Sequence, residues 1–248
     1  MRYLILGDIH SNLEAFKAVL KEASDMDIDK VVCTGDLIGY GADPSKCVQL
    51  MMSQPLEIYV AGNHEAAIFQ TGELNLNSLA AKGIEHTKEN LSDDESNWIF
   101  STAFWKKEFD NKCAVAHASY YYPNDFVYLK YNQDERMHCH RAMKEDDVDV
   151  LFIGHSHSPS IMPKDYRGYP VYSEVNFIDL NKMKPCIIDV GSVGQPRDGD
   201  PRSSFAVYDT EENSVIMNRV DYDIEKAANK IIEAGLPKRL ATRLEKGE

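Results

Sequence analysis

Short apolar segments alternate with amphipathic ones along the first 65 residues. The apolar segments have the length of buried strands and end in polar residues; they are residues 2–8, 29–36 and 57–65. Residues 11–23 carry apolar side chains at helical spacing, and Ser11 followed by Glu14 forms a capping-box pattern that predicts Ser11 as the N-cap. A second helix is predicted to open at Asp43, because Pro44 suits the first helical position. This alternation predicts parallel strands joined by right-handed crossovers.

The rest of the chain continues the mixed pattern. Residues 66–100 are polar and helical in periodicity, which indicates a helical insertion, and residues 134–145 predict another helix. Further strands are predicted where apolar runs are bounded by Gly, Pro and Asn turns, at residues 113–119, 148–157, 169–175, 185–192, 203–209 and 214–220. Residues 221–248 read as a helical tail. With no repeat and no low-complexity linker, residues 1–248 are expected to form a single α/β domain.

Polar side chains with metal-ligand chemistry follow the predicted strands. They are Asp8, His10, Asp36, Asn63, His64, His117, His155 and His157, and they include five of the eight histidines. In an open α/β sheet, ligand sites lie beyond the carboxyl ends of the strands, so these groups are expected to converge. Imidazole, carboxylate and amide ligands suit divalent Mn, Fe, Co, Ni or Zn, and the number of ligands exceeds what one ion needs. Two ions that share a carboxylate would suit phosphoryl transfer.

Each of these residues also has an ordinary structural explanation. Asp8 or Asp36 alone could cap a helix, and Asn63 after a glycine could occupy a turn. A single His117 could simply be a satisfied buried histidine. The pair His155 and His157, two residues apart after an apolar strand, is the least ordinary feature. The ordered set as a whole favours a metal site.

Composition narrows the classes of function. The formal net charge of −13 disfavours nonspecific binding to nucleic acids and to anionic membranes, because phosphate contacts need Lys and Arg. No apolar run approaches the ~20 residues that cross a bilayer, and the N-terminal apolar run is interrupted at Asp8 too early for a signal peptide. Five scattered cysteines without a CxxC pair suggest reduced thiols, and Cys33 is expected in the core. A cytoplasmic location is therefore expected.

Five ordered motifs carry a family resemblance. The segments GDIH, GDLIG, GNHE, AHAS and GHSH resemble the motif series of the calcineurin-like metallophosphoesterases. The segments GYGADP, GSVGQPRDGDPRSSFAVYD and IEAGLPKRLATRL extend the resemblance to the YfcE-like phosphodiesterase branch and over nearly the whole chain.

The resemblance implies a four-layer α/β/β/α sandwich with two divalent metal ions at its strand ends. One ion would be held by Asp8, His10, Asp36 and His157. The other would be held by Asp36, Asn63, His117 and His155, with Asp36 bridging. Mn²⁺ is the expected ion, with Fe, Ni, Co and Zn as alternatives. A bridging hydroxide would attack phosphorus directly, and His64 would stabilise the transition state or protonate the leaving oxygen.

Two positions depart from the family pattern. The protein-phosphatase branch has an aspartate three residues after the GD aspartate, which orients the catalytic histidine, and this chain has Gly39 there. His64 is therefore expected to lack a carboxylate partner, which leaves its role as a general acid open. Ala118 follows His117 where the family often has glycine, a change that retains the imidazole ligand.

Weaker signals concern substrate contacts and surface residues. In residues 191–203, Arg197 is a candidate ligand of a substrate phosphate, although the segment could equally be a plain strand connection; Arg202 is a poorer candidate. His138 and His140 lack further flanking ligands, so a solvated surface explains them better than zinc does. The aromatic run of residues 119–128 could wall a substrate pocket or pack over a loop.

The function predicted from the sequence is hydrolysis of phosphodiester or pyrophosphate bonds in small phosphorylated molecules by a two-metal enzyme. A phosphomonoesterase or protein phosphatase is the nearest alternative, and Gly39 makes the protein phosphatase less attractive. A non-catalytic metal-binding scaffold for protein partners is the alternative from another class, which the intact ligand set disfavours. A homo-oligomer is compatible with the sequence, which does not identify the physiological substrate.

Overall fold

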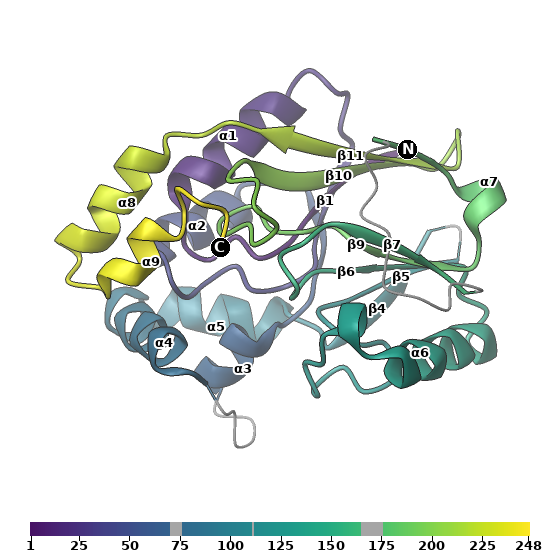
Figure 1. The fold of residues 1–248 in the computed structure, drawn as a ribbon, viewed down its shortest axis with the longest axis horizontal. Helices are drawn as coiled ribbons and strands as arrows, with labels where there is room; N and C mark the ends of the chain where they lie inside the picture. Colours follow the sequence, from purple (N-terminus) through teal and green to yellow (C-terminus); the bar gives the residue numbers. More distant parts are fainter. Residues whose placement is uncertain (70–75, 111, 165–175) are drawn as a thin grey trace.

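The computed structural model describes residues 1–69, 76–110, 112–164 and 176–248 (Figure 1). Two β-sheets form its centre. The first has the strand order β3-β2-β1-β10-β11-β8. Its strands in chain order are β1 (Arg2–Leu6), β2 (Lys30–Cys33), β3 (Leu56–Tyr59), β8 (Phe177–Asp179), β10 (Ser203–Asp209) and β11 (Ser214–Val220). As the alternating pattern predicts, β1, β2 and β3 pair in parallel, whereas β10, β11 and β8 are added antiparallel.

The second sheet has the order β4-β5-β6-β9-β7. Its strands are β4 (Lys106–Phe109), β5 (Cys113–Ala116), β6 (Val150–Ile153), β7 (Ser160–Pro163) and β9 (Cys186–Asp189). The pairs β5–β6 and β6–β9 are parallel, and the two edge strands β4 and β7 are antiparallel. Because the core strands of both sheets run in parallel, their carboxyl ends lie at one edge of each sheet.

Helices pack around the two sheets and against one another (Figure 1). In chain order they are α1 (Leu13–Ala23), α2 (Pro44–Met52), α3 (Asn63–Phe69), α4 (Ser78–Asn90), α5 (Asp93–Thr102), α6 (Gln133–Glu145), α7 (Leu180–Met183), α8 (Ile224–Glu233) and α9 (Lys238–Thr242). Figure 1 shows α1 and α2 on the side of the first sheet and α6 on the side of the second. The succession of helix, sheet, sheet and helix is the four-layer sandwich that the sequence predicts.

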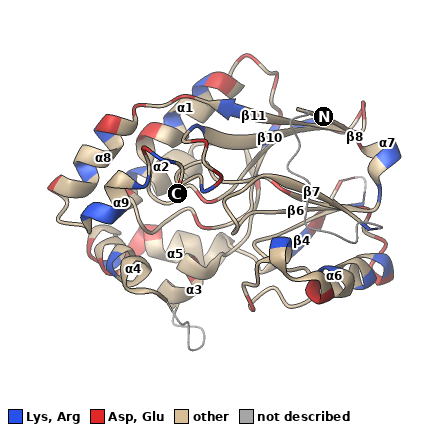
Figure 2. Cartoon of the chain, in the orientation of Figure 1, with Lys and Arg blue, Asp and Glu red and all other residues tan. Residues whose placement is uncertain are grey.

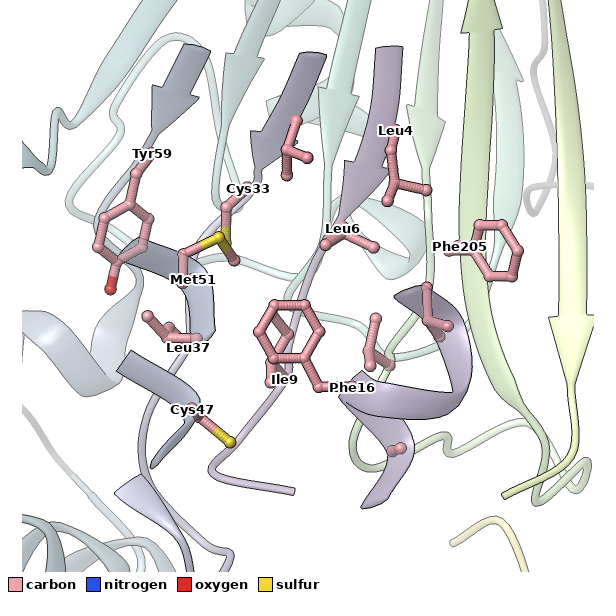
Figure 3. Packing of buried hydrophobic residues seen from close by; sticks show 14 of the residues in the cluster. Leu4, Leu6, Ile9, Phe16, Cys33, Leu37, Cys47, Met51, Tyr59 and Phe205 are labelled. Atoms are coloured by element: carbon pink, nitrogen blue, oxygen red, sulfur yellow. The ribbon is translucent and has the colours of Figure 1, made fainter. Parts of the chain in front are cut away.

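Three apolar clusters fill the spaces between these layers. The cluster between the first sheet and its helices includes Leu6, Phe16 and Met51, all fully buried (Figure 3). A second joins the facing surfaces of the two sheets, and a third joins the second sheet to α6. Truncating a side chain such as Phe16 to alanine would cost about 3–5 kcal/mol, because a cavity would add to the lost burial. The packed layers therefore hold the strand ends in fixed positions.

The structure corrects one predicted helix cap. The N-cap of α1 is Asn12, whose side chain accepts a hydrogen bond from the amide of Ala15 at 3.1 Å. Ser11 instead has a left-handed backbone (φ 53°), and its carbonyl accepts the amide of Asp43 at 3.0 Å. The capping-box pattern misled because Ser11 belongs to the loop that leaves β1. A true capping box occurs at α5, between Ser92 and Glu95.

Several other expectations can be compared with the structure. The helix expected at 134–145 and the helical tail are present as α6 and as α8 and α9. Pro44 opens α2 as expected. Strands β4, β7 and β8 were not predicted, and the strand expected at residues 169–175 lies outside the described residues. Cys33 is fully buried, as expected.

Surface features agree with the composition. No helix in the described residues is long and apolar enough to cross a membrane. Acidic and basic residues alternate along the outer helices (Figure 2).

Candidate metal centre

The structure brings the predicted ligands together beyond the carboxyl ends of the strands. Asp8 and His10 follow β1, Asp36 follows β2, Asn63 and His64 begin α3 after β3, His117 follows β5, and His155 and His157 follow β6. All are buried except Asn63, which is partly buried. Five of them have left-handed backbone conformations, with φ between 49° and 66°: Asp8, His10, Asp36, His155 and His157. For residues other than glycine this conformation is strained by about 1–2 kcal/mol each, and such strain often accompanies functional sites.

Backbone carbonyls orient three of the imidazoles. The Nδ1 atoms of His10, His117 and His157 lie 3.0, 2.9 and 2.6 Å from the carbonyl oxygens of Ile38, Thr34 and Gln195. A carbonyl only accepts, so each Nδ1 carries the proton and each Nε2 is left with a lone pair. A metal-ligating histidine usually has this second contact, which fixes its tautomer and ring orientation.

Two ring nitrogens with lone pairs face each other across a short distance: Nε2 of His10 lies 3.2 Å from Nε2 of His157. Two neutral lone pairs at such a distance repel each other unless a proton or a cation lies between them. In the second pair, Nε2 of His117 lies 3.1 Å from Nδ1 of His155. Among the described residues, Nε2 of His155 and Oδ1 of Asp8 are buried without a hydrogen-bond partner. This donor set therefore fits divalent cations.

Asp36 lies between the two groups of histidines. Its Oδ2 is 3.6 Å from Nε2 of His10 and 3.4 Å from Nε2 of His117, while its Oδ1 accepts the amide of His64 at 2.9 Å. Asp8 has Oδ1 3.2 Å from Nε2 of His157. Residues that could hold an ion form the sets Asp8–His10–His157 and Asp36–His117–His155, and a third set joins His10 and Asp36 to His64. The position of Asp36 allows one carboxylate to serve two ions.

Burial controls the protonation of these groups. It lowers the pKa of His10 and of His155 to about 3, and it lowers the pKa of His157 well below its usual range. These imidazoles are therefore neutral at neutral pH, which is the form that binds metals. Burial also disfavours a proton on His117, but the charge and hydrogen bond of Asp36 outweigh it and raise the pKa of His117 to about 10. A divalent cation would take the place of that proton.

Glu65 supports the site and was not recognised from the sequence. Its buried carboxylate accepts the amides of Asp36 at 2.9 Å, Leu37 at 3.0 Å and Gly62 at 2.8 Å. These bonds tie the turn after β2 to the turn after β3, and so fix Asp36 relative to Asn63. The only sequence signal for this role is the position of Glu65 at the end of the GNHE motif.

His64 packs in a cage of rings. Its ring centroid is 4.5 Å from that of Tyr40 and 4.7 Å from that of His10. Gly39 faces Nδ1 of His64, and a Cβ at Gly39 would lie only 1.9 Å from that atom. Among the described residues Nδ1 of His64 has no hydrogen-bond partner, so no carboxylate orients the ring through that atom, as expected from Gly39. Tyr40, which the sequence did not single out, occupies the neighbouring position.

Burial also sets the protonation state of His64. Burial lowers the pKa of His64 to about 3, so that the imidazole is neutral at neutral pH. A neutral imidazole offers one N–H donor and one lone pair. His64 is thus suited to hold a hydrogen bond to a substrate oxygen.

The two candidate arginines differ in position. Arg197 lies in the loop between β9 and β10, and its amide donates to the carbonyl of His157 at 3.1 Å. Its guanidinium carbon is 5.6 Å from the centre of the Tyr40 ring. Arg202 is exposed and paired with Asp200 at 2.6 Å. Of the two arginines, Arg197 is therefore the one with a contact to a predicted ligand.

Part of the aromatic run borders a cavity next to the site. The cavity has a volume of about 440 Å³, and its lining includes Tyr40, Asn63, Phe126, Tyr128 and His155. The ring of Tyr128 stacks on that of His155, with centroids 4.4 Å apart and an angle of 20° between the planes. Part of the run therefore borders this cavity, while Tyr120 is fully buried in the core. That the cavity takes a substrate stays a prediction.

The prediction for the pair on α6 was half wrong. The side chain of His138 is 43% exposed and lies 3.5 Å from Glu135. His140, however, is buried rather than solvated. It lies one turn after Arg136 and one turn before Met143, on the face of α6 that packs on the second sheet. Neither histidine belongs to a group that could hold an ion within the described ranges.

Comparisons with known proteins give one relative in sequence and two similar solved structures. An uncharacterized protein of Methanocaldococcus jannaschii is 34% identical over 247 residues, which is 97% of this chain and 96% of that protein. A crystal structure of a metallophosphoesterase from Sphaerobacter thermophilus has a TM-score of 0.86 and 33% identity, covering 100% of this chain and 99% of its own. A hypothetical protein from Pyrococcus horikoshii shares the fold, with a TM-score of 0.81, 16% identity and coverage of 100% and 98%.

The family itself is shown by a match over most of the chain. The model of the calcineurin-like phosphoesterase superfamily domain matches residues 1–213. This family implies divalent metal ions, and the clusters described above are candidate ligands for them. The chain belongs to the calcineurin-like phosphoesterase superfamily.

Proposed function

We propose that the protein is a two-metal phosphoesterase that hydrolyses phosphodiester or pyrophosphate bonds in small phosphorylated molecules. One observation carries the proposal: buried imidazole nitrogens and carboxylate oxygens gather in overlapping sets that could hold an ion, and backbone carbonyls bind the opposite ring nitrogens of three of the histidines. Without a cation, His10 and His157 would need a proton between their Nε2 atoms, and burial lowers the pKa of both imidazoles. Membership of the phosphoesterase superfamily supports the same reaction.

The proposed ligands divide into two sets. Asp8, His10, Asp36 and His157 would hold one ion. Asp36, Asn63, His117 and His155 would hold the other. Two bound divalent ions supply Lewis acidity and activate water, and Mn²⁺ is the proposed ion, with Fe, Ni, Co and Zn as alternatives. The chain's own part is to fix these ligands, and Glu65 and the backbone carbonyls provide that support.

His64 and Arg197 are proposed to act on the substrate directly. His64 is neutral in its ring cage, so we assign it hydrogen bonding to a phosphoryl or leaving oxygen rather than the delivery of a proton from an imidazolium. Arg197 would bind a nonbridging phosphate oxygen with its planar guanidinium. Nη2 of Arg197 donates to Oε1 of Gln195 at 2.7 Å, while Nε of Arg197 is buried without a hydrogen-bond partner among the described residues. A donor that binds more strongly as negative charge develops lowers the barrier.

The test compares metal-dependent hydrolysis of a nitrophenyl diester and a nitrophenyl monoester. The protein is stripped of metal and reloaded with Mn²⁺ or another divalent ion, and Asp36→Ala, His64→Ala and the control His138→Ala are assayed beside it. We expect diester cleavage that requires metal, is abolished in Asp36→Ala and is retained in His138→Ala. His64→Ala should lose about 10²–10⁴-fold in rate.

The alternative functions give different results in the same assay. Preferential cleavage of the monoester would favour a phosphomonoesterase or protein phosphatase. No cleavage of either ester by the metal-loaded protein would favour a binding scaffold over an enzyme. We further propose that residues 1–248 form a single domain, in which residues 66–100 are a helical insertion and residues 221–248 a helical tail. The proposed location is the cytoplasm. Sedimentation of the purified protein would show whether it is a homo-oligomer.

A further inference from the structure

The C-terminal tail packs against the candidate metal centre. Helices α8 and α9 lie beyond residue 213, where the match to the family model ends. Leu240 and Leu244 of the tail are buried in one cluster with Tyr40. Tyr40 in turn contacts His10 and His64 through its ring. The tail is therefore one side chain away from the proposed ligands.

The tail also brings a second arginine to the same tyrosine. The guanidinium carbon of Arg243 lies 5.9 Å from the centre of the Tyr40 ring, and that of Arg197 lies 5.6 Å from it. Arg197 is the nearer of the two to the proposed ligands, because its amide donates to the carbonyl of His157 at 3.1 Å, whereas Arg243 follows α9 in the tail. Both cations therefore lie close to one ring beside the metal centre.

Hydrogen bonds hold the chain end in this position. Nε of Arg243 donates to the carbonyl oxygen of Glu248 at 2.6 Å, and the amide of Glu248 donates to the carbonyl of Arg243 at 3.1 Å. The amide of Gly199, two residues after Arg197, donates to the carbonyl of Gly247 at 3.0 Å. The loop of Arg197 and the turn that follows Arg243 are therefore connected directly.

The positive charges of Arg197 and Arg243, both partly buried, repel each other. Burial lowers the pKa of Arg243 to about 10, and the charge of Arg197 is the next cause. This arrangement is unfavourable for the protein alone and becomes favourable when an anion binds between or beside the two groups. The formal charge of the whole chain is −13, so a pair of neighbouring arginines at the site is not a by-product of a basic surface.

We propose that Arg197 and Arg243 bind two consecutive phosphate groups, so that the substrate of this site is a pyrophosphate-linked molecule. The inference rests on the phosphoesterase function proposed above and narrows its substrate class. The phosphate beside Arg197 is the one attacked, and the next phosphate lies on Arg243. Water adds to the first phosphorus, the bond from that phosphorus to the bridging oxygen breaks, and the leaving phosphate departs with that oxygen and the electron pair, while the proton of the water is released.

A substrate with a single phosphate diester would use Arg197 alone. The cavity bordered by Tyr40 and Tyr128 then remains for the organic group of the substrate. Its aromatic walls suit a planar group, because rings of this kind stack face to face or edge to face.

The experiment measures binding by calorimetry to the Mn²⁺-loaded full-length protein. The probes are methylenediphosphonate, which keeps two linked phosphorus groups but resists hydrolysis, and methylphosphonate, which has one. Arg243→Ala is compared with the wild type, with Arg243→Lys and with the control Arg141→Ala, an exposed arginine on α6. Thermal unfolding of each variant shows that the tail is still folded.

Arg243→Ala should weaken diphosphonate binding about tenfold or more, the usual range for one charge-assisted contact, and change monophosphonate binding less than about twofold. Arg243→Lys should recover part of the loss, and Arg141→Ala should match the wild type for both probes. Equal losses for both probes would overturn the proposal, since Arg243 would then only position Tyr40; no loss for either would overturn it as well. If the predicted binding pattern appears in a protein that hydrolyses no phosphate ester, the proposed function fails and the anion site stands.

Discussion

The absence of a side chain at Gly39 should be required for the position of His64. Gly39 has φ 87°, and a Cβ built there would lie 1.9 Å from Nδ1 of His64 and 2.8 Å from its Cε1 and Cγ atoms. Real Cβ atoms are not found within 3.0 Å of such neighbours, so in Gly39→Ala something must move. The ring of His64 cannot yield freely, because it is fully buried and packed between Tyr40 and His10.

The size of the effect follows from that displacement. Restoring a 3.0 Å contact requires a shift of about 1 Å in the ring or in the backbone of Gly39. A misplacement of about 1 Å in a reacting geometry can reduce the rate about 10²-fold. The left-handed backbone adds a destabilisation of about 1–2 kcal/mol for any residue with a Cβ. Gly39→Ala should therefore lose about 10²-fold in kcat and only a few degrees in Tm.

The assay is metal-dependent hydrolysis of the nitrophenyl diester, with Tm measured on the same preparations. Gly235→Ala is the matched control, because Gly235 has φ 71° but no atom within 4 Å of the added Cβ. It should lose similar stability and retain full activity. Gly39→Asp should resemble Gly39→Ala, since its Cβ meets the same ring. Near-wild-type kcat in Gly39→Ala, or a gain of activity in Gly39→Asp, would refute the proposed packing of His64.

Two substitutions and the removal of metal test the interactions that hold the site and the surrounding fold. Glu65→Gln puts an NH₂ group against backbone amides that now donate to a carboxylate, so it should lower stability by about 2–3 kcal/mol and reduce activity. Asp43→Asn breaks the bonds to Lys46 and Lys230, both 2.7 Å, and should cost about 1 kcal/mol at pH 7. Chelation of metal should lower Tm, because bound ions stabilise the folded state.

The controls for these predictions differ. Glu85→Gln, at an exposed helical position, should leave Tm and activity unchanged; equal effects in Glu65→Gln and Glu85→Gln would exclude the proposed role of Glu65.

For Asp43, burial alone would raise the pKa of the carboxyl group, but hydrogen bonds from Lys230 and Lys46 lower that pKa below its usual value. The stabilisation is therefore present above about pH 4 and is lost as the pH falls through the lower folded-state pKa. A difference between Asp43→Asn and wild type that grows on acidification would contradict this sign. A Tm that does not change on chelation would contradict metal binding.

Much of the fold follows from hydrophobic periodicity. The run that ends in Asp8 and the run that ends in Asp36 have the composition of buried parallel strands, and parallel strands place their ends at one edge. The convergence of the site residues could therefore be predicted without coordinates. Strands β4, β7 and β8 could not, because they have only three or four residues and lie at sheet edges, where tertiary pairing rather than composition decides.

The residues that surround the ligands were harder to predict. Tyr40 lies in a glycine-containing loop with no periodicity, and its contact with His64 depends on the packing of the tail. Arg243 is separated from Arg197 by 46 positions in the sequence, and only the fold brings both to one ring. Ser11 is an example of a misleading local signal. Its capping-box pattern predicts an N-cap, but its carbonyl accepts the amide of Asp43 in the loop after β1, and Asn12 caps α1 instead. Contacts made by long-range packing leave no local signal.

The central claim, a centre for two metal ions, is tested most directly by metal stoichiometry. The protein is stripped, reloaded with Mn²⁺, separated from free ion and analysed for metal per chain, together with His155→Ala and His157→Ala. The account predicts about two ions per chain in the wild type and about one in each variant, because each histidine serves a different ion. A wild-type protein that retains no ion, or binds only one that both substitutions remove together, would contradict it.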